Sequence, residues 1–195
     1  MSGTVHTAVE MANLALAHLK EAPIRDFDYT SVASRWFKNH YDAHRDAYLA
    51  QHDWDFATEL VNLPADTVAP AFRFAYQYQK PSDCLRLPQQ TVDGKPDGQI
   101  IPHEVAGQKI LSDKPAPFPL RYIKRVTRET EFPPLFVHGF SLFLAASCAH
   151  VITGKNSRAE ALRQAALETL EQAARQDATQ GTPLPMIDLD IVTDR

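Results

Sequence analysis

The amino-acid sequence predicts an α+β fold: an antiparallel bundle of about four helices, an inserted small and mostly antiparallel β-sheet, and an extended C-terminal tail. Three observations lead to this fold class. Apolar residues repeat with a helical period near both ends of the chain, alternate with a period of two in the middle, and lose any period in residues 181–195. The 195 residues, 44% of them hydrophobic, suffice for a single compact domain over residues 1–180.

The first two helices are expected at about residues 4–20 and 31–51. In the first, apolar residues recur every three or four positions until Pro23 ends the pattern. In the second, three aromatic residues and a histidine fall on one face of the helix: Phe37, Tyr41, His44 and Tyr48. Each helix therefore has one side that must pack against the rest of the protein.

A period of two marks a β insertion at about residues 71–127. Short apolar runs separated by proline, glycine and aspartate fill this region, and residues 106–108 are expected to form a hairpin turn between two of them. Its first expected strand, residues 72–78, places four aromatic residues on one face: Phe72, Phe74, Tyr76 and Tyr78.

Two further helices are expected at about residues 134–153 and 157–177. The third carries large apolar residues at helical spacing with small residues between them, and Ser157 with Glu160 forms a capping-box pattern at the start of the fourth. The tail, residues 181–195, is expected to be an extended arm that is mobile in the free chain and orders on a partner, with a permanently disordered tail as the alternative. Its apolar residues alternate with aspartates, which is typical of an arm that lays one face on another surface: Ile187, Leu189 and Ile191.

The composition argues against several classes of protein. A net charge of -4 gives no global attraction to nucleic acid or to anionic lipid. The two cysteines, Cys84 and Cys148, lack the spacing of a disulfide framework or zinc site and are expected to be buried thiols. No signal sequence is recognised, and no segment is expected to approach the roughly 20 apolar residues that cross a bilayer. The chain is expected to fold in a cytoplasm without membrane contact.

Three patterns resemble reactive sites but lack required parts. His40 and His44 have the helical spacing of zinc ligands, but no third ligand is placed. Ser141 in the sequence GFSLF lies inside an expected helix and not on a strand-to-helix turn. The acids of the tail lack the glycine and closing glutamate of a calcium loop: Asp188, Asp190 and Asp194. We therefore expect no catalytic residue, cofactor or metal ion.

Two pairs of residues lie near the end of the second expected helix. Trp54 and Phe56 fall on one side of an extended segment and are expected to pin the helix-to-strand corner into the core. Arg45 and Asp46 are adjacent and so do not face each other on a helix, which predicts that they share no salt bridge and pair elsewhere.

One local cluster of positive charge occurs between residues 121 and 128. It is interpreted either as a solvated strand edge that discourages strand addition or as a contact with an acidic partner surface or DNA. Of the two contacts, the partner surface is favoured. The cluster comprises Arg121, Lys124, Arg125 and Arg128.

Five sequence patterns follow one another in order: NLALAHL, YDAHRDAYLAQHDWDFA, YQYQKPSDCLRL, LRYIKRVT and FSLFLAASCAHVIT. Together they resemble the tail tubular protein A, or head-to-tail adaptor (connector), family of short-tailed bacteriophages. The resemblance spans roughly residues 8–178. The family motifs are matched by Arg45, Asp46, Trp54, Phe56, Ala57, Pro81, Asp83, Cys84, Leu85, Arg86, Tyr122, Ile123, Leu144 and Ala145.

The resemblance implies a structural virion protein without enzymatic activity. Copies are expected to form a homo-oligomeric, dodecameric ring that docks beneath the portal protein and seats the tail nozzle protein and the tail fibres or spikes. The ring is expected to line the channel through which double-stranded DNA passes and to be assembled in the host cytoplasm into the virion tail. Because a channel that conducts DNA should not bind it tightly, the resemblance also favours a partner surface for the cations at residues 121–128. Closure of such a ring requires a heterologous interface, in which one face of each subunit meets a different face of the next.

Two alternatives from other classes stay open. A virion-associated peptidoglycan hydrolase needs two carboxylates opposed across a cleft, and the sequence contains acids but does not place them. A non-viral helical scaffold protein agrees with the composition, but it does not explain the ordered motifs.

Overall fold

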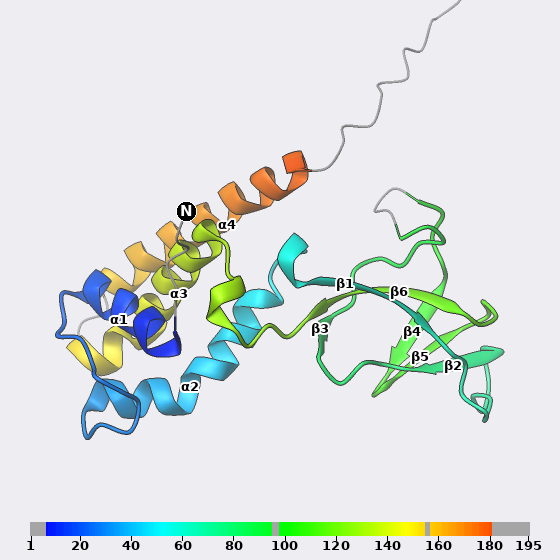
Figure 1. Cartoon of the computed structure of the whole chain (residues 1–195), viewed down its shortest axis with the longest axis horizontal. Helices are drawn as coiled ribbons and strands as arrows, with labels where there is room; N and C mark the ends of the chain where they lie inside the picture. The colour runs from blue at the N-terminus through cyan, green and yellow to red at the C-terminus, as the bar shows by residue number, and fades with distance from the viewer. Residues whose placement is uncertain (1–6, 95–97, 155–156, 181–195) are drawn as a thin grey trace, which may run out of the picture.

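The computed structural model describes residues 7–94, 98–154 and 157–180 (Figure 1). Over these residues the chain forms four α-helices and two small antiparallel sheets, which confirms the mixed α+β class. The helices gather at one end of the molecule and the strands at the other (Figure 1). The expected arm at residues 181–195 lies outside the described residues, and so do three of its apolar residues: Ile187, Leu189 and Ile191.

The first two helices begin at capping residues. α1, Ala8–Leu19, has a complete capping box, in which Thr7 accepts a hydrogen bond from the Glu10 amide and the Glu10 carboxylate accepts one from the Thr7 amide at 2.7 Å. α2, Val32–Leu49, is capped by Ser31, whose hydroxyl accepts a hydrogen bond from an amide of the first turn. The two caps therefore mark the start of each helix close to the position that the helical periodicity predicts.

α3, Pro134–Thr153, is the central helix of the core and contacts α1, α2 and α4, which spans Ser157–Gln180. Its apolar window has a mean hydropathy of 1.8, and 61% of that window is buried inside the protein. By length and composition this helix could cross a membrane, so the expectation that no segment approaches that length is wrong. Helices α1, α2 and α4 pack against its buried part.

Each sheet contains three strands within the described part of the chain. β6 is central in the first sheet, which has the order β1-β6-β3, and β5 is central in the second, which has the order β2-β5-β4. Gly107, with a left-handed φ of 60°, lies in the turn from β4 to β5, which confirms the predicted hairpin. The strands are β1 (Thr58–Leu63), β2 (Tyr76–Gln79), β3 (Cys84–Arg86), β4 (His103–Ala106), β5 (Lys109–Ser112) and β6 (Phe118–Lys124).

Two expectations about the β region are wrong. The strand expected at residues 72–78 begins only at Tyr76, because Arg73 adopts a left-handed φ of 74° that interrupts an extended backbone. Phe72 is consequently 76% exposed and does not lie on a buried face. The β region also begins before residue 71, with β1, whose sequence TELVNL lacks strict alternation of apolar and polar residues.

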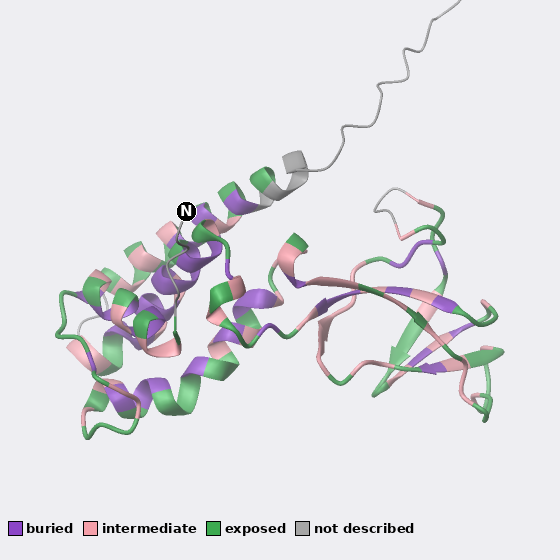
Figure 2. Cartoon of the chain, in the orientation of Figure 1, coloured by how far each residue is buried: buried purple, intermediate pink, exposed green. Residues whose placement is uncertain are grey.

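The buried residues form two separate clusters (Figure 2). The larger one joins the four helices and includes Trp54, and the smaller one lies in the β region around Tyr78 and Phe118. Cys148 is buried in the larger cluster, whereas Cys84 is only half-buried, so the expectation of two buried thiols holds for Cys148 alone. Each region therefore has its own apolar interior.

Candidate functional site: the helix–sheet junction

The segment after α2 carries the chain from the helical region into the first sheet. Trp54 precedes a single 3-10 turn, Asp55–Ala57, which leads directly into β1. Trp54 is 2% exposed, and its ring centroid lies 5.0 Å from that of Phe136 in α3. Phe56 is half-buried and contacts the same ring at 5.1 Å. The two aromatic residues anchor the corner in the helical core through a helical turn and not through the expected extended segment.

The adjacent residues Arg45 and Asp46 share an ion pair, contrary to prediction. Nη2 and Nε of Arg45 lie 3.0 and 3.2 Å from Asp46 Oδ1, and Nη1 donates to Asp42 at 2.8 Å. Adjacent positions do not face each other on a helix, but the long arginine side chain can reach back to its neighbour. Only 7% of this side chain is exposed, so the two carboxylates compensate a largely buried charge.

Asp46 also links α2 to the segment that follows β6. Its second oxygen, Oδ2, accepts a hydrogen bond from Nε of Arg125 at 2.6 Å. The Arg125 amide donates to the carbonyl of Asp83 at 2.8 Å, and the Asp83 carboxylate accepts from the hydroxyl of Tyr122 at 3.3 Å. One chain of polar contacts therefore runs from the second helix into the first sheet.

A second link joins the first sheet to the aromatic corner. Arg86 of β3 and Arg121 of β6 both pair with Asp53, the residue before Trp54, and Arg121 Nη1 lies 3.5 Å from Asp53 Oδ2. Burial, and then the charge of Arg121, lowers the pKa of Arg86. An arginine nevertheless keeps its charge in proteins, so Asp53 forms ion pairs with two charged guanidinium groups. We call the whole set the junction cluster: Arg45, Asp46, Asp53, Asp83, Arg86, Arg121 and Arg125.

The four cations between residues 121 and 128 each have an acidic partner within the chain. Their side chains range from 15% exposed at Arg121 to 80% exposed at Arg128. Their charge is therefore largely compensated inside the subunit, and contact with another molecule stays a prediction. The pairs are Arg121–Asp53, Lys124–Glu59, Arg125–Asp46 and Arg128–Glu131.

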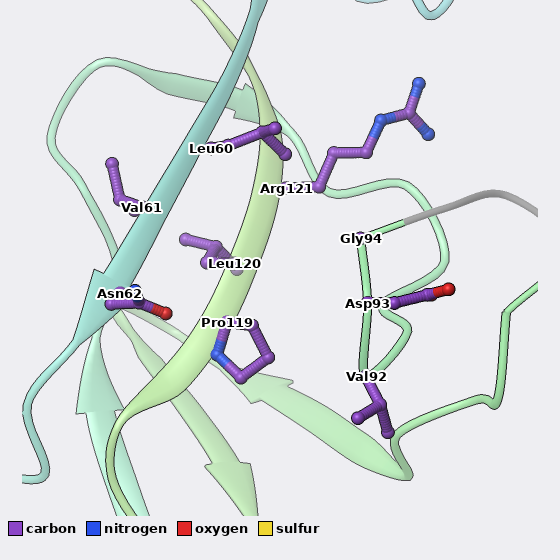
Figure 3. Close-up of a pocket in the computed structure, with 9 residues that line it drawn as sticks. All are labelled: Leu60, Val61, Asn62, Val92, Asp93, Gly94, Pro119, Leu120 and Arg121. Carbon is purple, nitrogen blue, oxygen red and sulfur yellow. The ribbon is translucent and has the colours of Figure 1, made fainter.

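A shallow groove of about 210 Å³ lies over the outer face of β1 and β6 (Figure 3). Leu60 and Arg121 are opposite each other in the register of these strands, and the loop at Val92 lies across the groove from them. Gln90 ties this loop to β6, because its side-chain amide donates to the Arg121 carbonyl and accepts from the Arg121 amide, both at 2.8 Å. Apolar side chains beside one arginine form the kind of lining found where proteins contact each other.

His40, His44 and Ser141, which resemble parts of reactive sites in the sequence, each contact a backbone carbonyl of their own helix. His40 Nδ1 lies 2.7 Å from the carbonyl of Trp36, and His44 Nδ1 lies 2.9 Å from that of His40. Ser141 is 2% exposed, and its hydroxyl donates to the carbonyl of His138 at 2.7 Å. Among the described residues, no group of three His, Cys, Asp or Glu side chains is placed to hold a metal ion.

We expect His18 to make stability fall in mildly acidic solution. Its Nε2 lies 3.0 Å from the Ser141 hydroxyl, and burial, followed by His138 of α3 and Arg158 of α4, lowers its pKa. Because the folded state favours the neutral ring, the unfolded state takes up the proton first. The stabilisation is present above the unfolded pKa of about 6.5 and is lost as pH falls from that value through the lower pKa of the folded state.

Urea denaturation of the wild type and of His18→Gln between about pH 7.5 and pH 5 measures this effect. The wild type should lose more stability than the variant as the pH falls. The exposed His40→Gln variant controls for loss of a histidine and should follow the wild type. Parallel curves for the wild type and His18→Gln would contradict the assignment.

The fold and the junction cluster define an α+β protein in which ion pairs and an aromatic corner join a helical region to a β region. No protein-family model matches the chain, and no curated protein matches its sequence.

Proposed function

We propose that this protein is a head-to-tail adaptor of a short-tailed bacteriophage, a structural virion protein whose copies form a ring between the portal and the tail nozzle. The ordered sequence motifs carry this proposal. Their residues are far apart in the sequence, yet Asp46 meets Arg125, and Asp53 meets Arg86, in the junction cluster. Motifs that contact one another in the fold act as one structural unit, and this contact supports the proposal.

In the proposed ring, the four helices form an antiparallel bundle that builds the wall, and the β region projects from it. Each subunit offers two different faces to its neighbours, so the dodecameric ring closes through heterologous contacts. Within the described residues, the most exposed large apolar side chains belong to the β region. We place contacts with other virion proteins there, at Leu60, Val68 and Phe72, which are 65%, 68% and 76% exposed.

The channel must let DNA pass without holding it. Binding to DNA depends on free lysine and arginine side chains that neutralise phosphates. This chain has a net charge of -4, and the four clustered cations each pair with an acid of the same subunit. We therefore assign Arg128, the most exposed of the four, to contact with a protein partner and not to DNA.

The free chain is expected to be monomeric or weakly associating, with ring closure templated by the portal. Sedimentation velocity of the purified protein should give a main species close to the chain mass of 21.8 kDa. Stable rings formed by the protein alone at low micromolar concentration would show that the portal is not needed as a template. The proposal that the protein forms a ring would still hold.

Two observations separate the adaptor from its alternatives. The reading frame should lie beside portal and tail nozzle genes, an arrangement that a non-viral scaffold protein does not predict. Purified cell walls should keep their turbidity in the presence of the protein, whereas a peptidoglycan hydrolase would clear them. Clearing of the walls, or a gene neighbourhood without any virion gene, would overturn the proposed function.

A further inference from the structure

A pocket of about 230 Å³ lies where the aromatic corner meets α3 and the last turns of α4. We call it the Trp54 pocket. Three aromatic rings and the two prolines at the start of α3 give it an apolar lining, and Ala173 and Gln176 of α4 form its remaining side. It is smaller than the roughly 300 to 1,000 Å³ typical of small-molecule sites, so a few side chains of a peptide fit it better than a cofactor does. Its main lining residues are Trp54, Phe56, Pro133, Phe136, Ala173 and Gln176.

We propose that residues 183–187 of the same chain, Pro-Leu-Pro-Met-Ile, dock in the Trp54 pocket. The pocket has no occupant among the described residues, and the chain continues for another 15 residues after Gln180. This inference concerns the isolated subunit and stands whether or not the protein assembles on a portal. For residues 183–187 it replaces the expectation of an arm that is mobile in the free chain.

The position of the pocket brings it within reach of this segment. Gln180 lies only about 6 Å beyond Gln176 along the helix axis, at 1.5 Å per residue. Gly181 and Pro183 favour the end of a helix and a change of chain direction. Each extended residue spans about 3.3 Å, so two or three residues suffice to return to the pocket. Docking within one chain also has a high effective concentration.

The chemistry of the segment matches the lining of the pocket. Proline-containing segments bind grooves lined by aromatic rings, and their restricted backbone loses little entropy on binding. Residues 183–187 carry no charge, whereas Asp188 and Asp190 follow immediately. Asp55 is the only charged residue in the lining, so it disfavours the acidic part of the tail and selects the neutral part. The acidic residues then remain outside the pocket, in solvent.

The protein contains only three methionines, Met1, Met11 and Met186, which permits a direct test by methyl-labelled NMR of the full-length chain. The Met186 methyl signal should be displaced by ring currents and should show nuclear Overhauser contacts to protons of Phe56, Phe136 or Trp54. The indole N–H signal of Trp54 provides a second reporter, and that of Trp36 provides an internal reference.

Matched full-length variants separate docking from general effects of the tail. Leu184→Ser combined with Ile187→Ser should return the Met186 methyl to its unstructured shift and move the Trp54 indole signal, leaving that of Trp36 in place. Leu189→Ser combined with Ile191→Ser, just beyond the docked segment, should change neither signal.

Two results would overturn the inference. A sharp Met186 signal at the unstructured shift, without contacts to the aromatic rings, would show that the pocket does not hold the segment. Contacts that disappear on dilution, while sedimentation shows dissociating dimers, would assign the pocket to the tail of a second copy. Contacts that persist on dilution in a monomer are the expected result.

Discussion

Replacement of Trp54 by alanine is expected to destabilise the fold by about 3 to 5 kcal/mol, the usual cost of truncating a large buried aromatic side chain. The Trp54 ring is packed between Tyr48 and Phe136, at centroid separations of 5.9 and 5.0 Å, and is 2% exposed. Its removal leaves a cavity at the point where the helical core meets the chain entering β1. Thermal and urea denaturation measure this loss directly.

Leu60→Ala is the matched control for this experiment. Leu60 follows the same corner but is 65% exposed, and substitutions at such positions usually change stability by no more than about 0.5 kcal/mol. If Trp54→Ala keeps the wild-type melting temperature but loses binding to the portal, Trp54 belongs to an interface and its assignment to the core is wrong.

Gly139→Ala in the second turn of α3 is expected to destabilise the protein by about 1 to 3 kcal/mol through overpacking. Helix propensity alone predicts the opposite sign, because alanine is favoured over glycine by about 1 kcal/mol. A Cβ at Gly139, however, would lie 2.1 Å from the Tyr48 hydroxyl oxygen and 3.2 Å from Cγ2 of Thr169. The Tyr48 ring is enclosed by neighbouring aromatic rings and is 1% exposed, so it cannot move aside cheaply.

Tyr48→Phe should partly rescue Gly139→Ala. This change removes the oxygen that the new methyl group would meet, although Cζ of the ring still lies 3.3 Å from the Cβ position. The Tyr48 hydroxyl is buried and has no hydrogen-bond partner in the described structure, so its loss alone should cost little. A double-mutant cycle should give a favourable coupling of about 1 kcal/mol or more. A stabilising Gly139→Ala, or additive effects, would contradict this account of the α2–α3 contact.

The helices could be predicted from the sequence because their signals are local. The capping box of Thr7, the cap at Ser31 and the left-handed Gly154 mark helix ends within a few residues of the expected positions. Helical periodicity between these ends follows from the need of each helix to bury one face. The sequence predicted Trp54 at the helix-to-strand corner, but it did not predict the 3-10 turn that follows Trp54.

The β region and the junction cluster depend on residues distant in the sequence, which explains the errors there. β1 is held by pairing with β6, more than fifty residues later, so its own sequence needs no strict alternation. The left-handed backbone at Arg73 carries no recognisable local signal. Arg45 and Asp46 share a bond because Arg125 and Asp42 complete the same network, which adjacency alone does not show.

Mass photometry of the portal ring from the same phage, with and without this protein, tests the adaptor function most directly. The portal ring should gain mass equal to a full ring of 21.8 kDa chains, in a single step and without partial occupancy at saturation. A portal ring whose mass stays unchanged in an excess of the folded protein would contradict the proposed function.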